Sequence, residues 1–374
     1  MSPVTLSSVA AVAAVLVASV MAQNTLPQTP LADKRFTYPD GIPYQVDTEP
    51  NLVRGGQFGY NQCNSTTEGP NSLCQTSFIN SIDDFCLWAP SKPNSLIADT
   101  EGEEVAWCTK PGRGTRLIPA GALKGVQFMK TPDYIQVVGF IDQVQINIQA
   151  EDSGGELDPH GADLRGNPLG GIVFSQTFSG GKKWDQVIEW HNFMGGNFFC
   201  FKACDPAGAN AAHFCEHVYD RIGCAYNAPN NAQQGVFETC LGDNQDFPGV
   251  YTKDGKVMTY SQPPESQGEI TAMPYEPKVP ASSSCTQYKS EDLYTGIASV
   301  KPSQSATSTG TGPAHSATST KGGAAGGSKP TGTSKPSGTS GAGPQSTSNG
   351  AASDLVAMSG LCLAGVVVSA ILFL

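Results

Sequence analysis

The pattern of apolar and polar positions in the middle of the chain is typical of β-strands. Apolar residues alternate with polar ones from Tyr134 to Ala150, and the parity of the alternation changes near Asp142-Gln143. Successive side chains of a strand point to opposite faces, so this change predicts a bulge or a turn between two strands. Further strands are expected at residues 126–129, 171–178 and 197–202.

Two other segments have helical spacing. In residues 184–193, Trp184, Val187 and Ile188 would lie on one helical face, and in residues 211–222 apolar side chains recur four apart. Frequent Pro and Gly elsewhere indicate many loops. The pattern as a whole predicts a mainly β domain with a few short helices, that is, a β-rich α+β fold.

The N-terminus has the features of a secreted protein. Residues 1–22 form a short apolar run that ends in Val20-Met21-Ala22, which is typical of a signal peptide. Residues 23–35 follow as a short polar leader that ends in the dibasic pair Lys34-Arg35. This pair predicts either a processing site for a secretory-pathway protease or an ordinary solvated turn.

The C-terminus resembles a signal for a glycosylphosphatidylinositol (GPI) anchor. Residues 355–374 are almost wholly apolar, and no Lys or Arg follows them. Small residues lie just upstream, as such a signal requires. We expect residues 350–374 to be removed and the anchor to be attached at Ser348, Asn349 or Gly350. The alternative is a tail-anchored membrane helix.

Between these ends the composition divides the chain in two. Residues 302–349 contain no aromatic residue and no Ile, Leu or Val, so they cannot bury enough apolar surface to fold. Residues 291–349 are therefore predicted to form a disordered, O-glycosylated stalk rich in Ser, Thr, Pro and Gly, with a bare flexible linker as the alternative. The candidate O-glycosylation sites are Ser303, Ser305, Thr307, Ser308, Thr309, Thr311, Ser316, Thr318, Ser319 and Thr320.

The cysteines indicate a disulfide-stapled domain at residues 36–290. Of the 11 cysteines, one lies in the segment expected to be removed, and the even remainder predicts up to five disulfides in a secreted chain. Their pairing cannot be deduced from one sequence. Zinc ligation by Cys200 and Cys204 is disfavoured, because thiolates tend to oxidise in this compartment. The candidate half-cystines are Cys63, Cys74, Cys86, Cys108, Cys200, Cys204, Cys215, Cys224, Cys240 and Cys285.

The net charge argues against one class of partner, and a short motif predicts a glycosylation site. The net charge of −11 has the wrong sign for nucleic-acid binding, so no nucleic-acid partner is expected. Asn64 begins the sequon Asn-Ser-Thr in a polar segment next to Cys63 and is the predicted N-glycosylation site.

No motif assigns a reaction. Residues 151–163 hold acids and His160, which would suit a metal or a carboxylate pair for glycoside hydrolysis, but a charged surface loop is the favoured interpretation. His213 and His217 are four apart, yet Glu216 stands in the wrong place for a zincin motif. The aromatic residues between Trp184 and Phe201 are interpreted as core rather than as a sugar-binding platform. We therefore predict no catalytic residue, metal site or cofactor.

Three long blocks carry a resemblance to a known family. They are residues 54–70 (RGGQFGYNQCNSTTEGP), residues 154–164 (GGELDPHGADL) and residues 199–206 (FCFKACDP). With the stalk and the apolar tail, they resemble the fungal macrophage-activating glycoproteins, which include immunoreactive mannoproteins of an encapsulated pathogenic yeast.

The resemblance implies a mannosylated surface antigen without an assigned reaction. Such a protein would be GPI-anchored to the outer face of the plasma membrane, present in the cell wall and partly secreted. Its glycans would be recognised by host mannose receptors, and T cells would respond to it. The alternative is a protein that binds or modifies a cell-wall polysaccharide.

Overall fold

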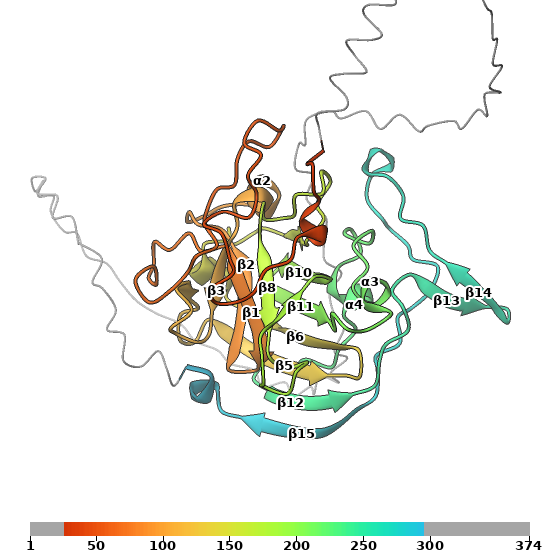
Figure 1. Cartoon of the computed structure of the whole chain (residues 1–374). Helices are drawn as coiled ribbons and strands as arrows, with labels where there is room; N and C mark the ends of the chain where they lie inside the picture. The colour runs from red at the N-terminus through yellow and green to blue at the C-terminus, as the bar shows by residue number, and fades with distance from the viewer. Residues whose placement is uncertain (1–25, 295–374) are drawn as a thin grey trace, which may run out of the picture.

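The fold is built on two β-sheets. A computed structural model of the chain describes residues 26–294 (Figure 1). The smaller sheet has six strands, and within it β1 pairs in parallel with β8, whereas β2 runs antiparallel to both of its neighbours. In spatial order its strands are β4 (Arg116–Leu117), β3 (Val105–Cys108), β2 (Asp84–Ala89), β1 (Thr76–Ser81), β8 (Ile172–Ser175) and β9 (Asp185–Val187).

The larger sheet has seven strands and is mostly antiparallel. Its centre is the run β5–β6–β11–β10, in which Phe201 faces Val137 on one side and Asn192 on the other. In spatial order its strands are β15 (Ser282–Tyr288), β12 (Phe237–Gly242), β5 (Leu123–Lys130), β6 (Tyr134–Ile141), β11 (Phe198–Cys204), β10 (Trp190–Gly195) and β7 (Gly155–Leu157).

The two sheets pack face to face around the main apolar core. Trp88 of β2 and Trp190 of β10 approach with ring centroids 5.9 Å apart, and both side chains are buried. The Asn192 side chain accepts a hydrogen bond of 2.9 Å from the backbone N–H of Trp88, which joins the sheets through a polar contact as well. A sandwich of this kind buries one face of each sheet.

A third layer covers the other face of the larger sheet. It contains the short helices α3 (Ala211–Phe214) and α4 (Gly223–Asn227), and the hairpin of β13 (Val250–Lys253) and β14 (Lys256–Thr259) extends beyond it (Figure 1). The centre of the sheet is therefore buried on both faces, and Val138 and Phe193 pack against Cys224 of this layer. The remaining short elements within the described part of the chain are α2 (Ile97–Thr100), η1 (Leu31–Asp33), η2 (Glu101–Glu103), η3 (Gln143–Ile146), η4 (Glu265–Gln267) and η5 (Ser290–Tyr294).

Lys202 of β11 attaches this covering layer to the sheet. Its side chain is fully buried, and its ammonium group donates to the carbonyl oxygens of Phe214 (3.3 Å) and Asn227 and to the side-chain oxygen of Gln245. It also lies 4.6 Å from the ring centroid of Tyr134. Burial lowers the pKa of Lys202 well below its ordinary value, while three acceptors match the three donor hydrogens of the charged form.

The predicted disulfide-stapled, mainly β fold with few helices is confirmed. All ten candidate half-cystines are paired, and two of the bridges, Cys204–Cys215 and Cys200–Cys224, join β11 to the covering layer. Cys200 and Cys204 are thus not metal ligands. The other three pairs are Cys63–Cys74, Cys86–Cys108 and Cys240–Cys285.

Both predicted helices are wrong in extent or type. Residues 184–193 form β9 and the start of β10, in which Trp190 faces the main core and His191 the covering layer. Residues 211–222 contain only the single turn of α3, because the two disulfides from β11 hold Cys215 and Cys224 close to the sheet. Val218, one of the apolar residues spaced four apart in this segment, is 51% exposed.

The strand predictions were more accurate. β5, β8 and β11 occupy the segments expected for them, and β6 fills the first half of the alternating run. The second half is not a strand but the 3-10 turn η3, followed by Asn147 in a left-handed conformation (φ 73°). The Gln143 side chain donates to the carbonyl oxygens of Gln149 (2.6 Å) and Asp152 (3.0 Å), which stabilises the turn.

The predicted terminal segments fall largely outside the described residues. This applies to the signal peptide at 1–22, to nearly all of the stalk and its O-glycosylation candidates, and to the anchor signal with Ser348, Asn349 and Gly350. At the edges of the domain, Leu31 of the leader and Tyr294 are buried, so residues 31 and 294 belong to the packed structure. Among residues 26–294, no helix has the length and apolar character needed to cross a bilayer.

We expect Lys202→Met to destabilise the domain strongly. Methionine fills a similar volume but leaves three buried acceptors without a donor, which should cost about 3–5 kcal/mol. Chemical denaturation under non-reducing conditions would measure this loss.

The matched control is Lys182→Met, because Lys182 is exposed and should change stability by less than about 0.5 kcal/mol. Equal stability of the two variants would show that Lys202 does not hold the covering layer.

Candidate functional site

The acidic segment 151–163 is partly buried, contrary to the expected surface loop. Glu156 is 5% exposed and Asp158 is 7% exposed. Glu156 lies in the edge strand β7 and pairs with Phe193 of β10, so both side chains lie on the face beneath the covering layer. Gly154 makes this pairing possible, since a Cβ atom there would lie 1.5 Å from the carbonyl oxygen of Met194.

A third carboxyl group, Glu101 of η2, lies beside the same edge strand. A Cβ atom on Gly155 would come within 2.9 Å of its Oε1 atom, and its Oε2 atom accepts a hydrogen bond of 3.1 Å from Asn167. We call Glu101, Glu156 and Asp158 the carboxyl cluster. Neither oxygen of Glu156 has a hydrogen-bond partner among residues 26–294.

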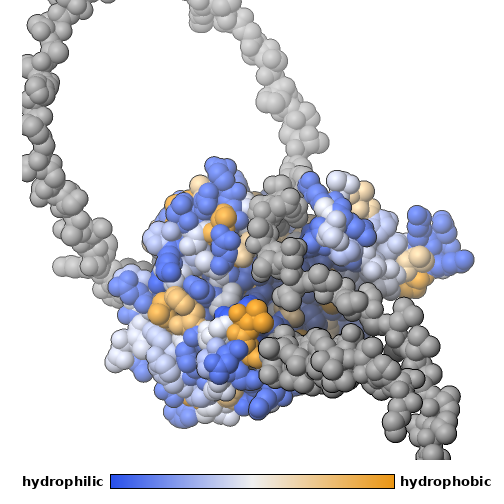
Figure 2. Space-filling model, turned by 90° about the horizontal axis from the view of Figure 1, so that it is seen from above, coloured by the Kyte–Doolittle hydropathy of each residue, from blue (hydrophilic) through white to orange (hydrophobic). Residues whose placement is uncertain are grey.

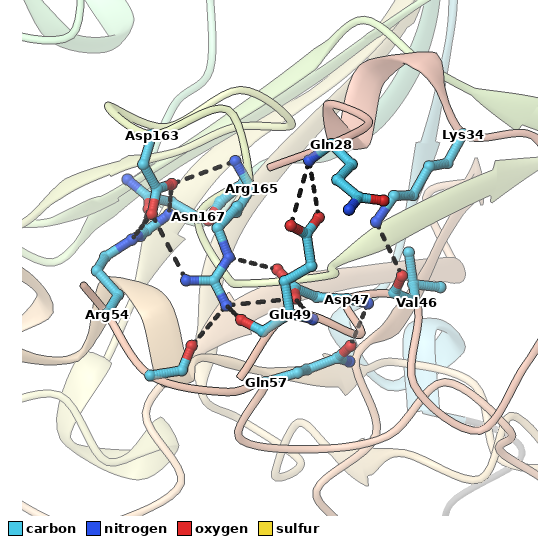
Figure 3. Close-up of polar contacts among 12 residues, drawn as sticks. Gln28, Lys34, Val46, Asp47, Glu49, Arg54, Gln57, Asp163, Arg165 and Asn167 are labelled. Atoms are coloured by element: carbon cyan, nitrogen blue, oxygen red, sulfur yellow. Dashed lines mark hydrogen bonds and ion pairs between the residues drawn. The ribbon is translucent and has the colours of Figure 1, made fainter. Parts of the chain in front are cut away.

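Two arginines hold the loop that follows the carboxyl cluster (Figure 3). Arg54 donates to Asp163 (Nε–Oδ2 2.9 Å) and to the side chain of Asn167. Arg165, whose side chain is 1% exposed, donates from Nε to Asp47 at 2.6 Å. These contacts join residues 47–57 to residues 163–167, so two of the blocks that carry the family resemblance meet here.

His160, Glu189 and His217 form a second group at the same edge, which we call the histidine pair with Glu189. His160 Nε2 lies 3.1 Å from Glu189 Oε2, and the two imidazole rings stack with centroids 3.7 Å apart and planes at 10°. His160 follows β7, Glu189 precedes β10, and His217 comes from the covering layer. All three side chains are partly exposed, at 17%, 17% and 35%.

Burial raises the pKa of all three members of the carboxyl cluster. It raises the pKa of Glu101 to about 8, with Asp158 as the next contribution. It raises the pKa of Glu156 well above the ordinary value, with Asp158 and Asp220 adding to the effect. Burial also raises the pKa of Asp158, although the backbone N–H groups of Gly161 and His160 oppose it. With a pKa of about 8, Glu101 is mainly protonated at neutral pH.

The two stacked histidines have pKa values that move in opposite directions. Burial acts to lower the pKa of His160, but its hydrogen bond and charge interaction with Glu189 outweigh burial and raise it overall. Burial, and then the neighbouring His160, lower the pKa of His217. His160 is therefore the more basic of the two histidines.

A surface groove opens beside these groups. It has a volume of about 690 Å³ and runs between residues 218–221 and residues 259–265. Asp220 and Glu265, which line it, are among the charges that raise the pKa of Glu101 after burial and Asp158. The part of the surface visible in Figure 2 is mostly hydrophilic, with small and separate hydrophobic patches.

The groove contains two tyrosines and a cross-linked rim. The rings of Tyr219 and Tyr260 lie 5.8 Å apart, and the Tyr219 hydroxyl donates to the Tyr260 carbonyl oxygen at 3.1 Å. The Arg221 side chain donates to the carbonyl oxygen of Pro263 at 2.7 Å, and its backbone N–H donates to the side-chain oxygen of Gln262 at 2.9 Å. The Tyr260 hydroxyl has no hydrogen-bond partner within the described part of the chain.

Sequence reasoning found only part of this site. The acidic segment supplied Glu156, Asp158 and His160, but Glu101, Glu189 and the groove residues carried no local signal. His217 was considered with His213, whereas its ring partner is His160 and His213 contacts Phe247. The interpretation of the aromatic segment as core is confirmed for Trp190, Phe193, Phe199 and Phe201, which are all buried.

Asn64 lies on the surface, as its predicted modification requires. Its side chain is exposed, and its Oδ1 atom accepts hydrogen bonds from the backbone N–H (2.9 Å) and the hydroxyl (2.6 Å) of Thr66. A second hollow of about 450 Å³ lies beside this turn and includes the stacked rings of Tyr44 and Tyr60.

Two fungal proteins are similar to the chain. Appressorium protein ROW2 of Mycosarcoma maydis is 44% identical over 233 residues, which are 61% of this chain and 79% of ROW2. Appressorium protein ROW1 of the same fungus is 45% identical over 232 residues, so the match spans about half (51%) of its length. No family model and no solved structure matches. The names of these relatives do not bear on the resemblance to macrophage-activating glycoproteins, which stays a prediction.

We expect Glu101→Gln to flatten the pH dependence of stability. The folded state retains a proton on Glu101 that the unfolded state releases above its ordinary pKa of about 4.5. This contribution is fully present below pH 4.5 and is lost as the pH rises through about 8. The thermal midpoint of the variant, relative to that of the original chain, should therefore rise between pH 5 and pH 9.

Glu103→Gln is the control, because Glu103 lies in the same turn and is exposed. If both variants shift the midpoint equally at every pH, burial of Glu101 does not perturb its titration.

Proposed function

The chain belongs to the family of fungal proteins that includes appressorium protein ROW2. We propose that its folded domain binds a cell-wall polysaccharide outside the cell. The groove carries the proposal, because it is an open hollow that combines aromatic, acidic and hydroxyl groups. Polysaccharides present both apolar ring faces and hydroxyl groups, so their binding sites need both kinds of side chain.

The arrangement of the groove suits recognition of a long, uncharged chain. Tyr260 is partly exposed and offers a ring face, whereas its hydroxyl is buried and has no hydrogen-bond partner among residues 26–294. Asp220 and Glu265 offer acceptors for sugar hydroxyl groups, and Thr259 and Ser261 add hydroxyl side chains. The hydrogen bonds of Arg221 to Pro263 and Gln262 fix the two walls, so little conformational entropy is lost on binding.

We expect Tyr260→Ala to weaken binding of the full-length secreted protein to insoluble β-glucan or chitin at least tenfold. The substitution removes the ring face while leaving the hairpin β13–β14 and the disulfides intact. Co-sedimentation with each polysaccharide would measure the change.

The control is Tyr288→Ala, since Tyr288 is 39% exposed on β15, away from the groove. Absence of binding to any wall polysaccharide, or equal binding by both variants, would contradict the proposal.

A second candidate function is that of a surface antigen, and the exposure of Asn64 favours it. We propose that the protein is mannosylated at Asn64 and along the stalk, and that it is GPI-anchored through Ser348, Asn349 or Gly350. Host mannose receptors would then recognise the glycans, and T cells would respond to the polypeptide. Asn64 supports this role because its sequon lies in an exposed turn. An N-linked glycan attached there would not disrupt the fold.

We expect phosphatidylinositol-specific phospholipase to release the protein from intact cells. The released protein should bind a soluble mannose receptor, and removal of both N- and O-linked glycans should abolish that binding. Asn64→Gln should remove only the N-linked glycan. Endoglycosidase treatment should therefore shift the electrophoretic mobility of the original protein but not that of the variant.

Retention on phospholipase-treated cells would exclude the anchor. Receptor binding that persists after complete deglycosylation would exclude recognition through mannose.

A further inference from the structure

The histidine pair with Glu189 has the composition of a metal site. Each of His160, Glu189 and His217 offers one ligand atom, and these atoms all lie within 4.8 Å of one another. The residues come from three separate parts of the chain, so neither spacing nor helical periodicity brings them together. Two imidazoles and one carboxylate form a ligand set that zinc uses in sites that leave one coordination position open.

We propose that His160, Glu189 and His217 bind one divalent transition-metal ion, for which zinc is the representative. The site does not depend on whether the groove binds a polysaccharide. The ion lies between His160 Nε2 and Glu189 Oε2, which are 3.1 Å apart. Ligand atoms around a tetrahedral zinc ion are separated by about 3.3 Å, given Zn–N distances of about 2.0 Å. The present separation of His160 and Glu189 already fits that geometry.

One side-chain movement completes the site. The two rings are nearly parallel, and an imidazole ligand must have the metal close to its own plane, so one ring must turn out of the stack. His217 is the one free to move, because its side chain is 35% exposed whereas that of His160 is 17% exposed. The turn brings its nitrogen toward the other two ligands from the solvent side.

Neighbouring carboxylates would support the ligands. Asp158 accepts hydrogen bonds from the backbone N–H groups of His160 (2.7 Å) and Gly161 (2.8 Å), which fixes the loop that carries the first ligand. Glu216 Oε1 lies 3.9 Å from His217 Nδ1, beyond hydrogen-bond distance, and adds negative charge beside this ligand. Together with Glu189, these groups make the surroundings acidic and attract a cation.

A buried carboxyl group lies close in sequence to the first ligand. Both carboxyl oxygens of Glu156 lack a hydrogen-bond partner among residues 26–294, although the residue is only 5% exposed. Glu156 lies on the same face of the sheet as the ligands, two residues before Asp158. Glu156 is therefore a further buried carboxyl group beside the loop that carries His160.

Zinc titration of the full-length protein tests the site. The chain is produced through a eukaryotic secretory pathway without a histidine tag, treated with a chelator and titrated calorimetrically with zinc chloride. We expect one ion per chain, bound with micromolar affinity or better. His160→Ala, Glu189→Gln and His217→Ala should each weaken binding at least tenfold.

His213→Ala is the matched control, because His213 is an exposed histidine of the same covering layer that lies outside the ligand set. Its variant should bind zinc within twofold of the original protein. Cobalt should give the intense visible absorption of a four-coordinate ion, and His160→Ala should abolish it. Thermal melts without metal establish that each variant is folded.

Two results would overturn the proposal. One is the absence of zinc binding by the folded, metal-free protein. The other is binding that His160→Ala and His217→Ala leave unchanged, or that His213→Ala weakens as much as they do, which would mean non-specific adsorption to surface histidines.

Discussion

One buried ammonium group joins the outer layer of this protein to its central sheet. Lys202 has no contact with solvent, and its three donor hydrogens meet acceptors from three separate parts of the covering layer. Two disulfides from the same strand fix the layer at Cys215 and Cys224. His217 and Tyr219 lie between these two cysteines, so the groove and the histidine pair depend on this attachment. The disulfides set the distance between layer and sheet, and the lysine sets its orientation.

The sequence predicted the fold class because alternation and cysteine content are strong, local signals. β5, β6, β8 and β11 were found in this way. The helix expected at residues 184–193 failed because Trp184, Val187 and Ile188 lie in and around β9, an edge strand of the smaller sheet. Val187 is buried in the main core and Trp184 packs against it, so their helical spacing is a coincidence. The helix expected at residues 211–222 failed because cysteine pairing, which one sequence does not reveal, constrains the chain more strongly than its apolar spacing.

The candidate site was predictable only where its residues are neighbours in sequence. Residues 151–163 were recognised as unusual, but their burial follows from the pairing of Glu156 with Phe193, a long-range contact. Glu101 and Glu189 are single acidic residues in ordinary surroundings, and nothing local marks them. The family resemblance lay in blocks that the fold brings together, since Arg54 of the first contacts Asp163 of the second (Figure 3). Much of their unusual composition is therefore explained by a buried polar network that positions the loop after β7.

The positions of the groove and of Tyr294 determine how the domain would face its surroundings. η4, at the rim of the groove, and η5, where the described chain ends, lie at opposite extremes of the molecule in Figure 1. A pull exerted on the chain beyond Tyr294 would thus be applied at the end remote from the groove. A partner held at that end of the chain would leave the groove open to a ligand that approaches from the opposite side.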